Sequence, residues 1–315
     1  MLLRRGLMSH SFAIVFIAFL SFACNKNVQD SIDTSKLSIA EKIASSKEFS
    51  LFQAAIVKTS MQSKLDSLKT YTLFAPTDEI MISSGMSMDR MNAMSIEQLG
   101  KIVKYHILPT RLFLDDFKMG IYYNETTLGG DTSFMTRNEQ GLYINGIKFL
   151  QTDILQRNGV IHIPSKLLMP AEGDLVEVMA VDTSLTIFNA ALSRTAYGGT
   201  DLINALVCGC KFTVFAPSND AFKLAGYPTI ASIESADYKK VVGLLSYHIS
   251  KERVFTSDWT NQMTVHMING RQVQIIQSGN EMMLKGEANL MPIKVLKHNT
   301  MAYHGVIHTI ERILE

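Results

Sequence analysis

Two cysteines separated by one glycine are the side chains of this sequence whose spacing most directly suggests chemistry. Cys208 and Cys210 flank Gly209, and two thiols this close could form a disulfide, exchange with other thiols or bind a soft metal ion. A bridge between residues two apart closes a small, strained ring. No other cysteine or histidine lies close in the sequence to complete a metal site. The pattern therefore favours a structural turn with two thiols, or a local bridge, over a redox or metal role.

Methionine is the second residue type with chemical potential, because the chain has 18 of them and several are clustered. Thioether sulfurs suit Cu(I), and the spacing in the cluster resembles that of exported copper-handling segments. Methionine also fills irregular gaps in apolar cores, which is the interpretation we favour. We therefore expect no cofactor, with a copper site as the alternative at Met86, Met88 and Met91.

The N-terminal segment has the composition of an export signal. Arg4 and Arg5 precede an apolar run from Phe12 to Ala23, which is too short to span a bilayer and ends at Cys24. The small residue before Cys24 and the polar stretch after it resemble the lipobox of bacterial lipoproteins, although Ser21 stands where leucine is common. The resemblance implies a signal peptide over residues 1–24 that ends at an acylated Cys24.

Residues 25–37 would then form a polar tether, and the protein would be lipid-anchored in the cell envelope, in the outer membrane, on either the surface or the periplasmic leaflet. Ordinary cleavage and a retained helix are the alternatives to lipidation.

Length and composition predict two globular domains. The chain has 315 residues, of which 47% are hydrophobic and 19% are charged, values typical of folded soluble domains. The formal net charge of +1 provides no electrostatic basis for a nucleic-acid partner. Any attachment to a membrane would therefore depend on the lipid at Cys24.

The sequence repeats itself after about 140 residues, which explains its length. Five blocks recur in the same order, with a boundary near residues 170–174. They are Leu51–Ile56 with Ile187–Leu192, Thr72–Thr77 with Thr213–Ser218, Tyr105–Ile107 with Tyr247–Ile249, Asn145–Gly146 with Asn269–Gly270, and Gly159–His162 with Gly305–His308. The offsets are near 140, except for the Asn-Gly block, whose offset is 269 − 145 = 124.

Local patterns predict helices early and strands late in each copy, which favours an α+β fold. Ser95 and Gln98 have the spacing of a capping box, and Thr77 and Ser218 are suitable N-caps after short β-prone runs. Both Asn-Gly pairs have the composition of hairpin turns. The segments Val160–Ile163 and Val306–Ile310 have the composition of strands.

As a set, these blocks resemble the fasciclin domain. The elements concerned are Thr-x-Phe-Ala-Pro-Thr/Ser, a Tyr-His pair about 30 residues on, and a closing Gly-Val-Ile-His. The resemblance implies two tandem domains, residues 38–169 and 174–315, each a β wedge with a helical cap. It implies a role in adhesion or matrix binding without a catalytic centre, and partner binding near Tyr105, His106, Tyr247 and His248.

Each of these residues also has a purely structural interpretation. His106 and His248 end apolar helix faces, where each would bond a backbone group while the tyrosine packs, and His162 and His308 lie within strand-like runs. Motifs for an esterase elbow, a zinc protease, a dinucleotide fold or a phosphate loop do not occur.

The sequence therefore favours a non-catalytic envelope lipoprotein that binds a surface or matrix protein or glycan. The alternative is an accessory subunit that captures a glycan for an outer-membrane transporter.

Overall fold

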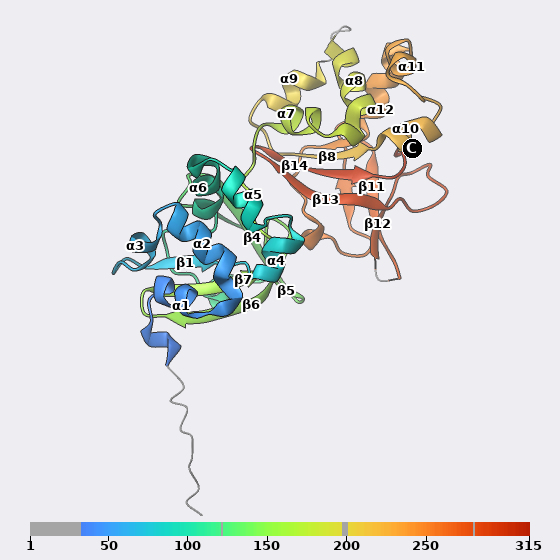
Figure 1. The fold of residues 1–315 in the computed structure, drawn as a ribbon. Helices are drawn as coiled ribbons and strands as arrows, with labels where there is room; N and C mark the ends of the chain where they lie inside the picture. The colour runs from blue at the N-terminus through green and yellow to red at the C-terminus, as the bar shows by residue number, and fades with distance from the viewer. Residues whose placement is uncertain (1–32, 121, 197–200, 280) are drawn as a thin grey trace, which may run out of the picture. The chain divides into compact units, whose positions relative to one another are not determined.

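The structure is a computed structural model that describes residues 33–120, 122–196, 201–279 and 281–315 (Figure 1). Every element below belongs to the unit formed by residues 34–315. The same order of elements occurs twice within it. We call residues 34–170 the first repeat and residues 171–315 the second repeat; Figure 1 colours them blue to yellow-green and yellow to red.

The expected signal peptide and its lipidated Cys24 lie outside the described residues, as do residues 25–32 of the expected tether. Within the expected tether, Thr34–Lys36 form the 3-10 turn η1, which packs against a strand of the first repeat. Among the described residues, no helix is long and apolar enough to cross a membrane.

Helices come first in each repeat. The first repeat has α1 (Ile39–Ser45), η2 (Lys47–Phe49), α2 (Ser50–Lys58), α3 (Gln62–Leu65), α4 (Asp78–Ser83), α5 (Met88–Ala93), α6 (Ile96–Tyr105) and η3 (Leu114–Asp116). The second has α7 (Leu175–Ala180), η4 (Thr183–Leu185), α8 (Thr186–Thr195), α9 (Leu202–Val207), α10 (Asn219–Leu224), α11 (Ile230–Glu234), α12 (Tyr238–Ser246) and η6 (Thr256–Asp258). Figure 1 shows α7 to α12 gathered on one side of the strands of their repeat.

The predicted helix starts are confirmed. The Ser95 hydroxyl accepts a hydrogen bond from the Gln98 backbone N–H while the Gln98 side chain accepts one from the Ser95 N–H, which completes the capping box of α6. Thr77 and Ser218 cap α4 and α10 with a single bond each, accepted by the hydroxyl from the Ile80 and the Ala221 N–H. Each cap satisfies an otherwise unpaired N–H and stabilises its helix by about 1 kcal/mol.

The strands of the first repeat form one sheet in the order β2-β1-β7-β6-β5-β4-β3. They are β1 (Tyr71–Phe74), β2 (Ile107–Leu108), β3 (Tyr122–Thr126), β4 (Thr132–Asn138), β5 (Gly141–Ile144), β6 (Ile147–Gln156) and β7 (Gly159–Pro164). The central strands β1 and β7 are parallel, with Leu73 opposite Ile161. Both are buried along their whole length, as expected of parallel strands covered on both faces.

The second repeat repeats this topology in two sheets, β13-β14-β8-β9 and β10-β11-β12. Its strands are β8 (Phe212–Pro217), β9 (Ile249–Ser250), β10 (Thr264–His266), β11 (Gln272–Ser278), β12 (Glu281–Lys285), β13 (Val295–Ala302) and β14 (Gly305–Ile310). The parallel pair is here β8 and β14, with Val214 opposite Ile307. The helices-then-strands pattern is thus an α+β fold, as predicted.

Each repeat has two apolar clusters, one packed among its helices and one among its sheet strands. Phe52 and Phe188 lie in the helical clusters, and Tyr105 and Tyr247 lie in the sheet clusters. All four rings are almost fully buried. Burying an aromatic side chain of this size contributes about 2 to 3 kcal/mol to folding, so the clusters fix the ends of α6 and α12 firmly against the sheets.

One predicted correspondence between the repeats is wrong. Asn145 and Gly146 form the two-residue turn between β5 and β6, and both have positive φ angles. Asn269 and Gly270 lie instead between β10 and β11, which correspond to β3 and β4. The true counterpart of the first turn is the nine-residue connection 286–294 between β12 and β13. Asn-Gly is favoured in any tight hairpin, so the shared dipeptide reflects turn chemistry and not a shared position.

Candidate functional site

His106 and His248 occupy equivalent, fully buried positions at the junction of a helix and a short strand. In His106, Nδ1 lies 2.9 Å from the Ile102 carbonyl oxygen, and Nε2 accepts the Leu168 N–H at 3.1 Å. His248 has the same two contacts, 2.8 Å to the Leu244 oxygen and 2.9 Å from the Leu314 nitrogen. Each ring therefore ties the last helical turn to the segment that follows the last strand of its repeat.

These contacts define the protonation state of both rings. Nδ1 faces a carbonyl oxygen and must carry the hydrogen, while Nε2 faces an N–H and must be the acceptor. Burial lowers the pKa of His106 and of His248 to about 4, although the bond to the helix carbonyl opposes the shift. Both imidazoles are therefore neutral near pH 7.

A second pair of histidines, His162 in β7 and His308 in β14, repeats this principle. Nε2 of each ring lies 2.9 Å from a backbone oxygen, that of Leu112 or of Val254. Nδ1 accepts a backbone N–H from Asp153 at 3.2 Å in the first repeat and from Asn299 at 3.4 Å in the second. Burial lowers the pKa of His162, and lowers that of His308 to about 4.

The adjacent tyrosines have different partners in the two repeats. The Tyr105 hydroxyl accepts the side-chain amide N–H of Asn145 at 2.7 Å, and burial raises the pKa of Tyr105 to about 12. The Tyr247 hydroxyl donates to the Gln272 carbonyl at 2.7 Å and accepts the Glu287 N–H at 2.9 Å. Tyr247 therefore anchors the long loop that replaces the Asn145 turn.

The four residues predicted to bind a partner thus lie inside the two repeats. Tyr105, His106, Tyr247 and His248 have at most 2% of their surface exposed. This geometry is the one expected if these residues are structural. Direct contact with a partner stays a prediction, and it would require displacement of the residues that cover them.

The two repeats meet beside the second histidine pair. Asp153 and Asn299 are equivalent residues with positive φ angles, 61° and 55°, and each accepts a backbone N–H through Oδ1, from Leu114 or from Thr256. Asn299 also has an amide nitrogen, which donates to Thr256 Oγ1 at 2.7 Å and to the Gly146 carbonyl of the first repeat at 3.4 Å. A carboxylate, as in Asp153, could not donate to the Gly146 carbonyl.

Further contacts across the same junction come from residues that the sequence analysis did not single out. The Arg253 guanidinium lies 3.8 Å from the centre of the Phe134 ring, and burial lowers the pKa of Arg253 to about 10. Phe134 also contacts Phe255, with 6.2 Å between ring centres. The Asn138 amide donates to the Ser257 carbonyl at 2.9 Å. Cation–π, aromatic and polar contacts therefore join the repeats.

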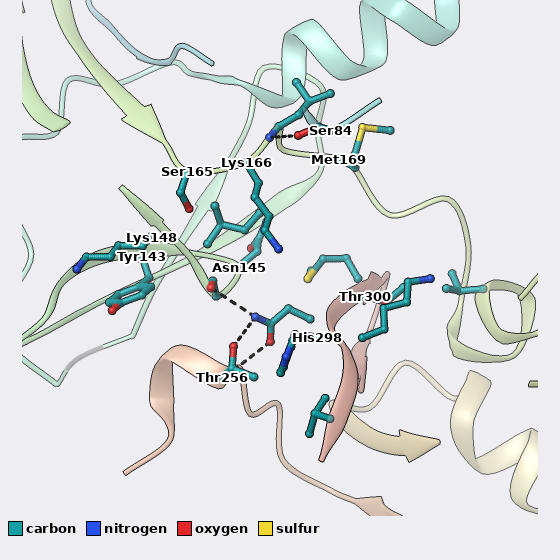
Figure 2. A pocket seen from close by; sticks show the side chains of 18 of the residues that line it. Ser84, Tyr143, Asn145, Lys148, Ser165, Lys166, Met169, Thr256, His298 and Thr300 are labelled. Atoms are coloured by element: carbon teal, nitrogen blue, oxygen red, sulfur yellow. Dashed lines mark hydrogen bonds between the residues drawn. The ribbon is translucent and has the colours of Figure 1, made fainter. Parts of the chain in front are cut away.

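A cleft of about 1340 Å³ opens next to this junction and is lined by both repeats. Figure 2 shows Ser84, Lys166 and Met169 along one wall, and Thr256 and His298 along the other. The volume exceeds the range typical of small-molecule sites, roughly 300 to 1,000 Å³, so the cleft can hold an extended ligand such as a peptide or an oligosaccharide.

The lysines that line the cleft differ in their ion pairs. Lys294 and Lys297 are paired with Glu281 and Asp182, at 2.9 and 3.1 Å. Lys166 has no such ion pair among the described residues, and Figure 2 shows its side chain directed into the cleft.

The rings of His298 and Trp259 also line the cleft. Burial and the charge of Lys166 lower the pKa of His298, so that its imidazole is neutral near pH 7. The Trp259 Nε1 nitrogen is buried and has no hydrogen-bond partner among the described residues. The cleft therefore offers a ligand a lysine and a neutral imidazole.

The three methionines of the alternative copper site lie in different surroundings. Met86 and Met91 are buried in the helical cluster, whereas Met88 is 42% exposed. Met88 and Met91 line a small apolar pocket of about 340 Å³ that does not include Met86. Among the described residues, no group of three or more His, Cys, Asp or Glu side chains is placed to hold a metal ion. Gap filling accounts for Met86 and Met91.

Comparisons with known proteins identify the recurring unit. The profile of the Fasciclin domain matches the chain twice, over residues 47–170 and 183–315. Transforming growth factor-beta-induced protein ig-h3 of Oryctolagus cuniculus is 23% identical over 290 residues, which cover 90% of this chain and 38% of the relative. Periostin of Homo sapiens is 29% identical over 143 residues, 45% of this chain and 17% of periostin. The chain therefore spans less than two fifths of these relatives.

Two further comparisons concern a bacterial protein and a solved structure. Protein sll1483 of Synechocystis sp. is 27% identical over 158 residues, which cover 44% of this chain and 78% of the relative. The structure of a FAS1 domain pair from the insect cell adhesion molecule Fasciclin I aligns with 85% of this chain and 97% of its own, with a TM-score of 0.41 and 15% identity.

Proposed function

Because the chain belongs to the fasciclin domain family, we propose that it is a non-catalytic adhesion or surface-interaction module held at the cell envelope by lipid on Cys24. Its partner is a protein or glycan of a cell surface or matrix. The observation that carries this proposal is the double match to a domain that typically serves adhesion or interaction. The apolar run that ends at Cys24 supports the lipid anchor.

The cleft beside the junction is the surface we propose for the partner. It is large, it is lined by both repeats, and the Lys166 side chain is directed into it. An ammonium group directed into a concave site favours a ligand with hydrogen-bond acceptors. Both a protein loop and a glycan meet that description.

Protease digestion of intact cells tests the proposed location. The wild-type protein on whole cells is compared with the Cys24→Ala variant, which cannot carry the lipid. We expect rapid digestion of the wild-type protein without lysis and release of the variant from the membrane fraction. Protection until lysis would place the protein on the periplasmic side and would exclude binding to a host cell or an external matrix.

A second candidate function is glycan capture for an outer-membrane transporter, and the size of the cleft favours it. Calorimetric titration with acidic and neutral oligosaccharides would test it, with Lys166→Ala expected to weaken binding about 10-fold. Lys148→Ala is the matched control, because Lys148 also lines the cleft but points away from its centre in Figure 2.

Co-purification separates the two functions. A stable complex with a transporter would support capture, whereas binding to foreign cells without such a complex would support adhesion.

A further inference from the structure

Cys208 and Cys210 are both solvent-exposed free thiols in the loop between α9 and β8. This placement is unusual, because free cysteine is among the most buried residue types and behaves in most proteins as a small apolar side chain. Neither thiol belongs to an apolar cluster of the second repeat. Packing therefore explains neither residue.

The glycine between them brings the two side chains together. Gly209 has a φ angle of +82° with open space around the position of a Cβ atom, so the chain bends here. Residues two apart in an extended chain have Cα atoms about 7 Å apart, whereas a disulfide requires roughly 4.4 to 6.8 Å. The bend shortens this separation, and the two thiols lie close enough for each to shift the pKa of the other.

The first repeat shows that the loop does not need thiols. Ser67 occupies the position of Cys208 and donates its hydroxyl to the Lys64 carbonyl at 2.7 Å. Cys208 makes the same contact, from Sγ to the Ala205 carbonyl, at 2.9 Å. A hydroxyl thus supplies the local structural bond, and the thiols add chemical reactivity that the turn itself does not require.

We propose that Cys208 and Cys210 form a surface dithiol–disulfide couple that exchanges with disulfides and thiols of other molecules. In the oxidising direction, the Cys208 thiolate attacks one sulfur of a donor disulfide and releases the first donor thiolate. The Cys210 thiolate then attacks Cys208 Sγ and releases the second. One S–S bond forms in this protein and one breaks in the donor, and the two thiol protons end on the two released donor thiols.

The surroundings assign the order of attack. Interaction with Cys210 and the charge of the nearby Lys251 lower the pKa of Cys208, whereas interaction with Cys208 raises the pKa of Cys210. Cys208 therefore loses its proton first and acts as the nucleophile. Cys210 is left to resolve the mixed disulfide.

Equilibration with glutathione tests this couple. The full chain carries Cys24→Ala, so that only these two thiols are left. It is incubated in mixtures of reduced and oxidised glutathione. The reaction is then quenched with acid, free thiols are alkylated, and the mass of the protein is measured by mass spectrometry. We expect both thiols to disappear together, with a loss of two hydrogens and little glutathione adduct. In Cys208→Ser or Cys210→Ser the adduct should accumulate at least ~10-fold more, because no neighbouring thiol can displace it.

The chain offers a matched control for exposure alone. Ser67→Cys, placed in a chain that also carries Cys24→Ala, Cys208→Ser and Cys210→Ser, puts one thiol in the equivalent loop with the same local hydrogen bond. It should give a stable adduct. Independent modification of Cys208 and Cys210 at the rate of this control would overturn the proposal. Thiols that resist oxidation, and become protected from alkylation only when Cu(I) is added, would overturn it in favour of a soft-metal site.

Discussion

The first and second repeats share the same pair of buried histidines but differ in the residues and turns around them. In both, one histidine ties the end of a helix to the closing segment, and another ties a strand to a loop, through backbone atoms alone. Around the histidines, Asp153 is replaced by Asn299, and a two-residue turn is replaced by the loop 286–294. Bonds to the backbone allow neighbouring side chains to diverge, and one of the divergent residues, Asn299, joins the repeats through its bond to Gly146.

Acidification should cause the largest loss of stability in both repeats. The pKa of His106, His248 and His308 is about 4 in the folded protein, below the unfolded value of about 6.5. The unfolded chain therefore binds more protons between these values. The stability from each neutral ring is fully present above pH 6.5 and is lost as the pH falls to 4, by about 3 kcal/mol per ring.

The second repeat should be the first to unfold in acid. The Asp153 carboxylate lies 4.0 Å from His162 and raises its pKa against the effect of burial. His308 has the neutral Asn299 in place of a carboxylate, and the charge of His298 lowers the pKa of His308 further. Trp259, the single tryptophan, contacts His308 with 5.4 Å between ring centres. Its fluorescence should change at a higher pH than the far-UV circular dichroism of the whole chain. Coincident transitions would contradict this difference.

Removal of either helix-end histidine should have the next largest effect, and the same effect in both repeats. His106→Ala leaves a cavity and deprives the Ile102 carbonyl and the Leu168 N–H of their partner. We expect a loss of about 3 kcal/mol in the free energy of unfolding, and an equal loss for His248→Ala. Urea denaturation measures both. An unchanged midpoint together with weaker partner binding would instead support a direct binding role for these histidines.

The sequence predicted the repeat, the α+β class and the helix caps because these depend on local patterns. The capping box at Ser95 and the N-cap at Ser218 require only residue types at fixed spacing. The predicted correspondence of the two Asn-Gly turns was wrong for the same reason, since Asn-Gly at 269–270 indicates a hairpin but not its place in the sheet. Only the order of the strands determines which turns are equivalent.

The junction could not be predicted because it depends on tertiary contacts between distant residues. Arg253 and Phe134 are 253 − 134 = 119 positions apart, and neither lies in a recognisable motif. Asn299 occurs in a polar run typical of an exposed strand. The exchange of Asp153 for Asn299 was the one signal available, and the two align only when β6 and β13 are paired by structure.

Replacement of Arg253 and of its counterpart Arg111 tests whether the cation–π contact stabilises the protein only where it crosses the junction. Arg253→Ala removes a half-buried guanidinium that lies 3.8 Å from the Phe134 ring across the junction, and we expect a loss of about 1 to 2 kcal/mol. Its counterpart Arg111 is exposed and lies 5.5 Å from Phe113 within the first repeat, so Arg111→Ala should change stability by less than about 0.5 kcal/mol. Equal losses in thermal denaturation would show that the cation–π contact does not contribute.

A reciprocal exchange of Asp153 and Asn299 should have the smallest effect on stability and gives the sharpest test. Asn299→Asp keeps the oxygen that accepts the Thr256 N–H but loses the amide that donates to Gly146 and Thr256. We expect a loss of about 1 kcal/mol at neutral pH. Asp153→Asn keeps the acceptor for the Leu114 N–H and should change stability little at that pH.

The same two variants should have opposite effects in acid. A carboxylate at position 299 favours protonated His308, as Asp153 favours protonated His162, so Asn299→Asp should shift the Trp259 transition to lower pH. Asp153→Asn removes that help from His162 and should shift the unfolding of the first repeat to higher pH. Amide hydrogen exchange of β7 and β14 as a function of pH measures each repeat separately. If neither strand responds to its own exchange, the acid difference between the repeats has another cause than this pair of residues.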